Sequence, residues 1–487
     1  MADPLLKALK RHEVPTWWRD AKLGIFVHWT PASVPAFAPV EDDVTGMMRS
    51  GDRRAMGWSP YTEWYENSLR FPDSPVAQHH RATYGSREYR SFAKDWEAGL
   101  ETWDPEEWAR TFAATGARYV VLVTKHHDGY CLWPTDVRNP HVADWRCSRD
   151  VVGELGEAVR GQGMRFGVYY SGGLDWTFDD RPMGAISDML QAIPRGDYPA
   201  YAEAHVRELI TRYRPSVLWN DIAWPSEGKD LWPLFRHYYD TIPDGVVNDR
   251  WMPWHPLMGA LRSNLASKAF DAAATRQARK DAGVIPPEPP FYDVRTPEYV
   301  SFPSIQRRPW ECVRGIDKSF GYNAQSLDEH FLTQHDLLWS FADMVSKNGN
   351  LLLNVGPRGV DASIPDEQRA RLAWLGEWMT TNESAVRATR PWVRAEGATA
   401  EGAAVRFTAR DREVFAIVEP SGATTGMTVS FTDVRPTRTT VVTAVDGDPR
   451  PWRVVDGALQ VEAGMPAGTG DAPTVVRFVD VDAAPGT

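Results

Sequence analysis

Short, almost continuously apolar segments alternate with amphipathic helical segments along most of the chain, and this alternation limits the fold more than any other feature. The apolar segments are rich in β-branched and aromatic residues and lie at 23–29, 117–124, 165–171, 216–221 and 245–251. Uninterrupted apolarity is typical of strands in a parallel sheet that is covered on both faces. Between them, apolar residues at three- and four-residue spacing predict helices over 102–115, 149–162 and 198–213.

Repeated strand–helix units favour a (β/α)8-like barrel over an open doubly wound sheet. A dinucleotide-binding fold is disfavoured because no strand is followed by G-x-G-x-x-G. Beyond about residue 390, short alternating strands between Gly, Asp and Pro turns predict a small antiparallel β-sandwich. We therefore expect a barrel catalytic domain at 1–388 and a C-terminal β-sandwich domain at 389–487, the latter a stabilising appendage.

One stretch, at about 252–290, does not fit the strand–helix rhythm. Its Ala- and Arg-rich part, 263–283, predicts a helix, and PPEPP at 286–290 forces an extended exit. We interpret the stretch as an insertion on a barrel loop, where it would shape the mouth of the active site or an oligomer contact.

The composition narrows the class of ligand. With 54 Lys+Arg against 65 Asp+Glu, the net charge is −11, which disfavours binding to nucleic acid. The 22 tryptophans suit a neutral ligand with a flat apolar face, such as a sugar ring.

The sequence also predicts a cytoplasmic protein without a membrane-spanning segment. The N-terminus shows no secretory signal, and no apolar run reaches the length of about 18 residues that a spanning helix needs. Three cysteines, an odd number, fit a reducing compartment.

Polar, aromatic and ionisable residues appear where each predicted strand ends, which is where barrel enzymes carry their catalytic groups. The clusters are His28-Trp29, Lys125 to Gly129 with His126 and His127, Tyr169 to Ser171, Trp219 to Asp221, and Asn248 to Trp251. Any one of these residues alone is more simply a structural hydrogen-bonding group or a helix cap. Five such clusters together indicate an active site.

The histidine pair raises the question of a metal. Adjacent residues on a strand point to opposite faces, and no third ligand stands at a recognisable spacing from His126 and His127. We therefore expect no metal and no cofactor.

The cluster composition favours a glycosidase, which needs one ionised and one protonated carboxyl group. Imidazoles, an arginine and a carboxylate can bind sugar hydroxyls while a Trp face covers the apolar side of the ring. Asp221, between Trp219 and Trp224 at the end of a central strand, is the best nucleophile candidate. We expect the general acid to come from a loop, where the exclusion of water raises the pKa of its carboxyl group.

Several blocks resemble the α-L-fucosidases of glycoside hydrolase family 29. They follow one another in the family's order from about Pro15 to Pro391, and the sandwich also fits the family's two-domain layout. The blocks are PTWWRDAKLGIFVHWTPASVPA, YTEWY (61–65), YVVLVTKHHDGYCLW, RFGVYYSGGLDW, SVLWNDIAWP, WECVRGIDKSFGYN and VSKNGNLLLNVGPRG.

The resemblance implies a retaining mechanism through a covalent fucosyl–enzyme intermediate, with Asp221 as nucleophile. It also implies a set of sugar-binding residues: His28, Glu63, Trp64, His126, His127, Tyr169 (rather than Tyr170), Trp219 and Arg250.

The acid/base is the part of the pattern that varies among family members. The segment 292–299 resembles the acid/base block of bacterial members and nominates Glu298. Glu311, in the Trp310-Glu311-Cys312 block, is the alternative, because the insertion displaces Glu298 along the sequence. If Glu298 is the acid/base, Glu311 would support its neighbours by hydrogen bonding.

The resemblance thus implies an exo-glycosidase that releases terminal α-L-fucosyl residues from fucosylated oligosaccharides or glycosides by double displacement. The alternatives are a retaining glycosidase for a related sugar, such as a β-D-galactoside or β-L-arabinoside, and a catalytically silent carbohydrate-binding barrel. A metal-dependent barrel hydrolase ranks below both. A homo-oligomer is left open, since barrel glycosidases often assemble.

Overall fold

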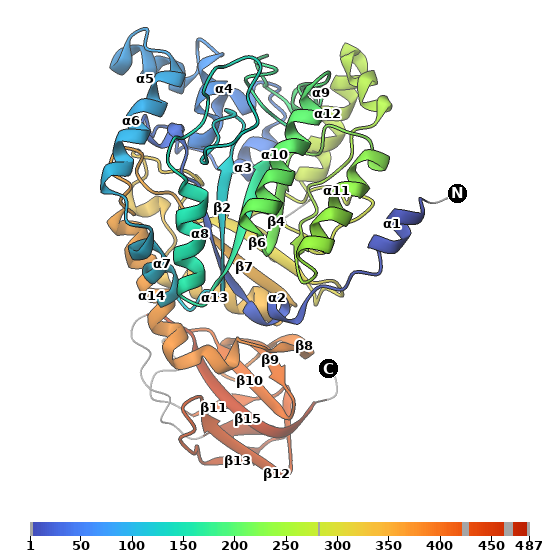
Figure 1. Ribbon diagram of the computed structural model, residues 1–487. Helices are drawn as coiled ribbons and strands as arrows, with labels where there is room; N and C mark the ends of the chain where they lie inside the picture. The colour runs from blue at the N-terminus through green and yellow to red at the C-terminus, as the bar shows by residue number, and fades with distance from the viewer. Residues whose placement is uncertain (1–2, 281–282, 421–427, 462–470, 485–487) are drawn as a thin grey trace.

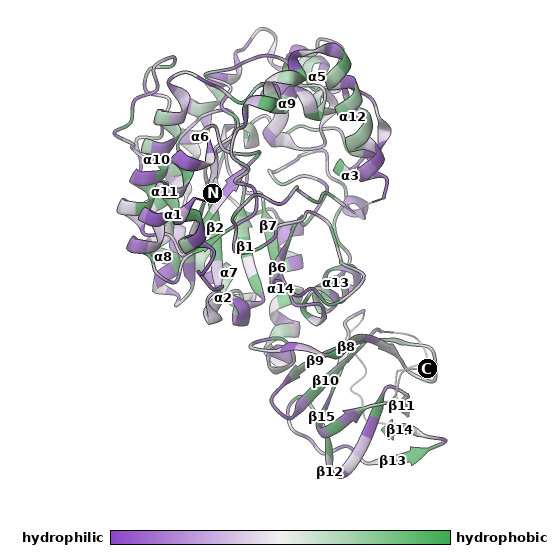
Figure 2. Ribbon diagram, turned by 90° about the vertical axis from the view of Figure 1, so that its right-hand side faces the viewer, coloured by the Kyte–Doolittle hydropathy of each residue, from purple (hydrophilic) through white to green (hydrophobic). Residues whose placement is uncertain are grey.

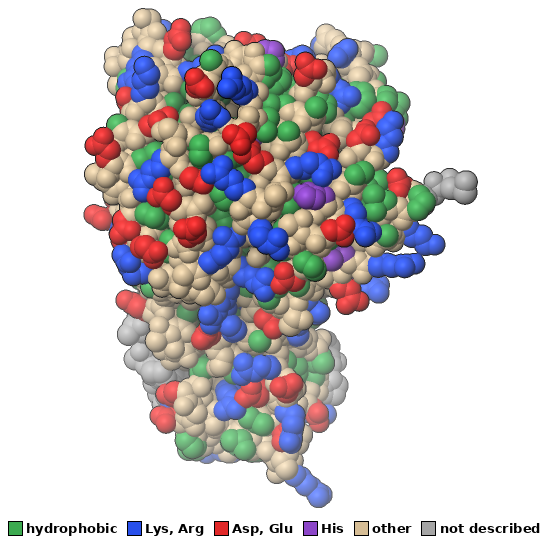
Figure 3. All heavy atoms as spheres, viewed as in Figure 1, with side chains coloured by type: hydrophobic (Ala, Val, Ile, Leu, Met, Phe, Trp, Pro, Cys, Tyr) green, Lys and Arg blue, Asp and Glu red, His purple; other side chains and the backbone are tan. Residues whose placement is uncertain are grey.

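The computed structural model describes residues 3–280, 283–420, 428–461 and 471–484. A helix-covered barrel lies above a smaller body of antiparallel strands in Figure 1. In the described part of the chain, no helix is both long and apolar enough to cross a membrane. Acidic and basic side chains are interspersed over the face in Figure 3, without a continuous field of one sign.

The barrel core is a parallel sheet, and all five strands expected from the sequence belong to it. Within the described residues its strands are β1 (Leu23–Val27), β2 (Tyr119–Lys125), β3 (Arg165–Ser171), β4 (Val217–Asp221), β5 (Val246–Val247), β6 (Trp310–Gly315) and β7 (Gly349–Val355), in the spatial order β5-β4-β3-β2-β1-β7-β6. Nearly every strand residue is buried, and β1 and β7 are drawn in apolar colours in Figure 2. Burial on both faces explains the uninterrupted apolar runs.

The segment 293–298 lies between the two edge strands. Val294 pairs with Asn248, which directly follows β5, and Glu298 pairs with Val313 of β6, both in parallel orientation. These bridges take the place of an eighth strand and close the sheet. The expected (β/α)8-like barrel is confirmed, with an irregular segment at one of its eight positions.

Helices surround the sheet. Those packed along its outside are α7 (Pro105–Ala114), α8 (Val151–Gly161), α10 (Tyr198–Tyr213), α11 (Gly228–Thr241), α13 (Gln334–Ser346) and α14 (Asp366–Asn382). The predicted helix over 198–213 coincides with α10. The one predicted from 102 begins only at Pro105, because the Asp104 side chain caps it by accepting the Glu106 N–H.

Shorter helices occupy the N-terminal segment and the loops. They are α1 (Pro4–Leu9), α2 (Thr16–Ala21), α3 (Val44–Ser50), α4 (Tyr65–Leu69), α5 (Pro75–Tyr84), α6 (Phe92–Gly99), α9 (Ile186–Gln191) and α12 (Asn264–Ala278). The stretch interpreted as an insertion forms α12, as its composition predicted; residues 281–282 of that predicted helix lie outside the described residues. Helix α12 packs against α3 and α9.

The C-terminal strands form two antiparallel sheets in the described residues. They are β8 (Arg390–Ala398), β9 (Ala404–Arg410), β10 (Glu413–Val418), β11 (Val429–Phe431), β12 (Val434–Ala444), β13 (Trp452–Val455), β14 (Ala458–Val461) and β15 (Thr474–Ala483), in the orders β12-β15-β10-β9-β8 and β11-β14-β13. Apolar residues from both sheets, including Val405, Phe407, Phe431 and Phe478, share one core. The predicted β-sandwich is confirmed; the parts of it expected at 462–464 lie outside the described residues.

Candidate active site

A cavity of about 120 Å³ opens at the carboxyl ends of the barrel strands. It brings together residues that are far apart in sequence, as the strand-end pattern predicted. The predicted site residues that line it are His28, Glu63, Trp64, His126, His127, Tyr169, Trp219, Asp221, Arg250 and Glu298.

Asp221 is the last residue of β4, and both of its carboxylate oxygens accept hydrogen bonds. The Tyr169 hydroxyl donates to Oδ2 at 2.9 Å, and the Ile222 backbone N–H donates to Oδ1 at 2.9 Å. Ile222 and Ala223 have φ of 66° and 123°, a region that β-branched Ile rarely adopts. Such strain persists only where the surroundings impose it, and it is commonly found at functional sites. The turn after β4 thus fixes the Asp221 carboxylate.

Arg250 links Asp221 to Glu298. Its Nη1 lies 3.0 Å from Asp221 Oδ1, and its Nη2 lies 2.7 Å from Glu298 Oε1. Burial opposes the positive charge, but the two carboxylates outweigh it and raise the pKa of Arg250. One cation therefore holds two carboxylates at one cavity, the pair of groups that glycosidic hydrolysis needs.

Glu298 lies on the segment that closes the barrel. Its backbone N–H and C=O both pair with Val284, at 2.8 and 3.0 Å, and its Oε2 accepts the Tyr61 hydroxyl at 3.1 Å. The next residue, Tyr299, has a φ of 54°. Both candidate catalytic carboxylates are thus followed by a backbone conformation that non-glycine residues seldom adopt.

Glu311 lies elsewhere in the barrel. It is the second residue of β6, near the amino ends of the strands, where it accepts the hydroxyl of Tyr119, the first residue of β2. Burial raises the pKa of Glu311 to about 7. Of the described residues that line the cavity, Glu298 is one and Glu311 is not.

The surroundings of His28 and His127 determine which ring nitrogen carries the proton. Asn354 donates its amide N–H to the Phe320 carbonyl, so its oxygen faces His28 Nδ1 as an acceptor. The Ser171 hydroxyl donates to the Leu174 carbonyl, so its oxygen likewise accepts from His127 Nδ1, at 2.7 Å.

Both rings therefore carry the proton on Nδ1 and leave the Nε2 lone pair free to accept a hydrogen bond. Burial lowers the pKa of His28 to about 3 and that of His127 to about 4, so both rings stay neutral. Neutral acceptors of this kind suit the hydroxyl groups of a sugar.

His126 and His127 lie on the same cavity, with ring centroids 4.0 Å apart. The expectation that they point to opposite faces was wrong, because β2 ends at Lys125 and strand alternation no longer applies beyond it. The Nδ1 of His126 is buried and has no hydrogen-bond partner among the described residues. In the same part of the chain, no group of three or more His, Cys, Asp or Glu side chains is arranged to hold a metal ion.

Glu63 and Trp64 come from a single 3-10 turn, Thr62–Trp64. Burial raises the pKa of Glu63 to about 7, although the Thr62 hydroxyl donates to its carboxylate at 3.0 Å. The Trp64 ring stands edge-on to His127, at 5.3 Å between centroids. The turn therefore presents a polar group and an aromatic face side by side.

Trp219 and Tyr169 form the aromatic part of the cavity, stacked at 5.3 Å. The Arg250 guanidinium lies 4.8 Å above the Trp219 ring. Trp224 and Trp251, which the strand-end pattern also suggested, instead pack on each other at 4.9 Å, and neither is among the described cavity residues.

The structure decides between two neighbouring tyrosines. The Tyr169 hydroxyl reaches Asp221, while that of Tyr170 bonds His205 of α10 at 3.1 Å, on the outer side of the sheet. Successive strand residues face opposite sides, so only one of the two can serve the cavity.

Two residues at the site were missed at the level of sequence: Tyr61 and Asn354. Asn354 precedes the last residue of β7, so the strand-end rule would have found it had that run been treated as a strand. Tyr61 precedes the Glu63-Trp64 pair on a loop and carries no periodic signal.

A parallel barrel with two carboxylates, neutral imidazoles and aromatic faces at the carboxyl ends of its strands defines a glycoside hydrolase. A family model described as alpha-L-fucosidase matches residues 2–384. An alpha-L-fucosidase of Branchiostoma floridae is 30% identical over 466 residues, which cover 93% of this chain and 90% of the relative. The chain belongs to the alpha-L-fucosidase family.

Other similar proteins are also fucosidases. Human tissue alpha-L-fucosidase is 28% identical over 420 residues, which cover 84% of this chain and 76% of that protein. A crystal structure of Thermotoga maritima alpha-fucosidase in complex with a mechanism based inhibitor is 37% identical, with a TM-score of 0.80, and the match covers 97% of this chain and 99% of that one. The barrel and the sandwich are therefore both shared.

Proposed function

We propose that this protein is an exo-acting α-L-fucosidase that hydrolyses terminal α-L-fucosyl residues of glycans or glycosides with retention of configuration. The observation that carries the proposal is the Arg250 bridge, which holds Asp221 and Glu298 at one cavity lined by neutral imidazoles. Family membership supports fucose as the sugar.

The proposed reaction runs in two displacements. Asp221 attacks the anomeric carbon while protonated Glu298 gives its proton to the departing oxygen, which breaks the glycosidic bond and leaves fucose covalently attached to Asp221. Glu298, now ionised, takes a proton from water, and that water displaces Asp221 and releases fucose.

Surrounding groups support the two roles. The Tyr169 hydroxyl and Arg250 Nη1 each donate to a different oxygen of Asp221, which orients the carboxylate as a nucleophile. Arg250 contacts Glu298 as well, so it must release that oxygen, or share it, when Glu298 takes up the proton for the first step.

The proposed catalytic domain is 1–388, since every described residue that lines the cavity falls within it. The sandwich at 389–487 would then act as an appendage. A cytoplasmic location stays a prediction from the sequence, and the oligomeric state stays open.

The experiment is hydrolysis of an aryl α-L-fucoside followed by NMR of the first anomer released. We expect α-L-fucose first and β-L-fucose only later, by mutarotation. Release of β-L-fucose first would contradict retention.

A panel of aryl glycosides tests the sugar specificity. We expect the α-L-fucoside to have the highest kcat/KM. A higher value for a β-D-galactoside or β-L-arabinoside would overturn the specificity, and no turnover of any of them would favour a silent binding protein.

A further inference from the structure

The lining of the catalytic cavity consists of two chemically different parts, a polar and aromatic floor and an aliphatic wall. Its floor carries the ionisable and aromatic residues described above, most of which are buried, while Asp221 and Arg250 are partly buried. One wall is aliphatic and is formed by Val44, Met47, Met48, Met56, Met189 and Val284. Four of these residues are among the chain's 13 methionines. The residues of the floor account for sugar binding, but they do not account for four methionines on one wall.

Part of this methionine wall lies toward the opening of the cavity. Met48, Met189 and Val284 are only partly buried, whereas Val44, Met47 and Met56 are 6–8% exposed. An exo-acting enzyme holds the terminal sugar on the closed floor, so the leaving group points toward the opening. The Val284 backbone also pairs with Glu298, the proposed donor of the proton to the leaving-group oxygen.

The insertion fixes the position of this wall. Helix α12 packs against α3, which carries Met47 and Met48, and against α9, which carries Met189. Asp271 of α12 accepts the Arg53 Nε–H at 2.9 Å, and the Ser187 N–H and hydroxyl at 2.9 and 2.8 Å. One buried carboxylate thus ties α9 and the segment after α3 to the inserted helix.

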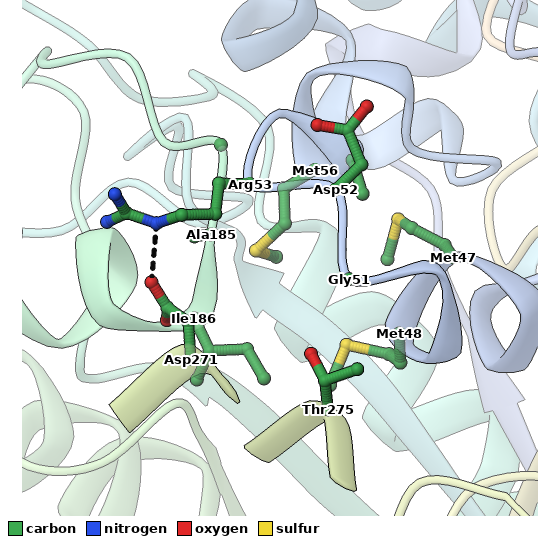
Figure 4. Close-up of a pocket in the computed structure, with 12 residues that line it drawn as sticks. Met47, Met48, Gly51, Asp52, Arg53, Met56, Ala185, Ile186, Asp271 and Thr275 are labelled. Carbon is green, nitrogen blue, oxygen red and sulfur yellow. Dashed lines mark hydrogen bonds and ion pairs between the residues drawn. The ribbon is translucent and has the colours of Figure 1, made fainter. Parts of the chain in front are cut away.

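A second hollow lies behind the methionine wall (Figure 4). It is small, with a cavity volume of about 30 Å³, and shares Met47, Met48 and Met56 with the catalytic cavity. Its other side is formed by Ile186, Asp271 and Thr275, among others. Methionine side chains are unbranched and adaptable, so they can change rotamer to fit groups of different shape.

We propose that the methionine wall is the leaving-group subsite and that it selects apolar aglycones, of the alkyl or aryl class, over hydroxylated sugars. This rests on the proposed function, because it assumes that a fucosyl residue occupies the floor. A sugar leaving group would need directed hydrogen-bonding partners for its hydroxyl groups. Thioethers and aliphatic carbons instead bind apolar groups, because the contact removes apolar surface from water. The insertion contributes Val284 and holds the elements that carry the methionines in position.

The test compares octyl and methyl α-L-fucosides, whose alkoxide leaving groups are of similar basicity but differ in apolar surface. We expect kcat/KM to be roughly tenfold or more higher for the octyl fucoside. A fucosyl-galactose disaccharide should be a poorer substrate than the octyl fucoside.

Substitutions locate the effect. Met48→Gln and Met189→Gln should each lower the octyl-to-methyl ratio severalfold, and Asp271→Asn should lower it by releasing α3 and α9. Met258→Gln is the matched control, since Met258 lies in the same insertion but is not among the described residues of either hollow, and it should leave the ratio unchanged.

The outcomes separate the two proposals. Turnover of fucosides with an octyl-to-methyl ratio near one, or a ratio insensitive to Met48→Gln and Met189→Gln, would overturn the subsite while the fucosidase assignment stands. Failure to hydrolyse any fucoside would overturn the proposed function, and the subsite with it.

Discussion

Glu298 and Glu311 differ in place and in surroundings, and the difference predicts different kinetic behaviour. Glu298 lines the cavity and bonds Arg250 and Tyr61, whereas Glu311 is sealed among the amino ends of the strands. Glu298→Ala should slow fucosides with poor leaving groups by about 10²–10⁴-fold, because those need a proton on the departing oxygen. Activated aryl fucosides should be slowed far less.

Glu311→Ala serves as the comparison. It should lower stability without changing the ratio of rates between good and poor leaving groups. The assignment of the acid would be wrong if Glu311→Ala showed the leaving-group dependence and Glu298→Ala did not.

Asn354 is predicted to act through His28. The Asn354→Leu variant lacks the oxygen that accepts the His28 Nδ1–H. The proton is then no longer held on Nδ1, and Nε2 is no longer kept free as an acceptor. A buried donor without a partner costs about 1–3 kcal/mol, so we expect kcat/KM to fall roughly tenfold to a hundredfold, mainly through KM.

The matched control is Asn350→Leu on the same strand. Asn350 is equally buried but donates to the Trp18 carbonyl, away from the cavity. It should lower the melting temperature and leave KM unchanged. Equal effects of the two variants on KM would show that Asn354 has only a structural role.

At this scale the sequence predicted much of the site, because catalytic groups of a barrel gather where parallel strands end. Asp221, Tyr169 and His28 were all found by that rule. It failed for Trp224 and Trp251, which follow β4 and β5 but turn into the helical layer. Hydrogen-bond partners such as Asn354 and Ser171 depend on contacts between strands, and one strand's sequence cannot show those.

Among the elements, the segment that closes the barrel was the least predictable. Residues 293–298 contain Asp, Arg, Thr and Pro and form isolated bridges with their neighbours, so they carry no apolar run. The buried strands β1 to β4 were predictable from their uninterrupted apolar runs, and helix α10 from its helical spacing of apolar residues. Segment 293–298 is held by its neighbours instead.

The insertion should affect Glu298 through its backbone. A β-carbon added at Gly283 would lie 2.4 Å from the Glu298 carbonyl oxygen and 2.7 Å from Val300 Cγ2, so Gly283→Ala must displace the Glu298 strand segment. Misplacement by about 1 Å can cost about a hundredfold in rate. We expect kcat on poor leaving groups to fall roughly tenfold to a hundredfold.

Gly259→Ala, in the same insertion, is the control for this variant. No atom lies within 4 Å of a carbon added there, so activity should be retained. Unchanged kcat in Gly283→Ala would show that the pairing of Val284 with Glu298 does not position the acid.

In the whole molecule, the sandwich packs against the barrel helices and away from the cavity. Arg406 of β9 pairs with Asp343 of α13, and the Trp378 indole N–H of α14 donates to the Pro473 carbonyl at 2.8 Å. Lys347, next to α13, pairs with Glu396 of β8 at 2.6 Å. These contacts fit the role of an appendage that stabilises the barrel.

Buried carboxyl groups should make the stability of the molecule depend on pH. Because burial raises the pKa of Glu311 from 4.5 to about 7, the folded state keeps a proton that the unfolded state loses between these values. The free energy of unfolding should therefore fall as pH rises from 4.5 to 7, by about 1.4 kcal/mol per pH unit from this group.

Urea unfolding of wild type and Glu311→Gln from pH 5 to 7 measures that contribution. The variant cannot lose the proton, so its stability should fall less steeply with rising pH by about that amount. Parallel pH profiles for the two proteins would contradict the effect of burial on Glu311.

The proposed retaining reaction depends on Asp221 as its nucleophile, and azide rescue tests this role most directly. Asp221→Gly should lose roughly a thousandfold or more in turnover of an aryl α-L-fucoside while keeping the wild-type melting behaviour. Azide, placed where the carboxylate was, should restore turnover and give β-L-fucosyl azide, identified by NMR. Formation of α-L-fucosyl azide would contradict the role of Asp221 as nucleophile. So would an Asp221→Gly variant that azide does not rescue and that hydrolyses the fucoside as fast as the wild type.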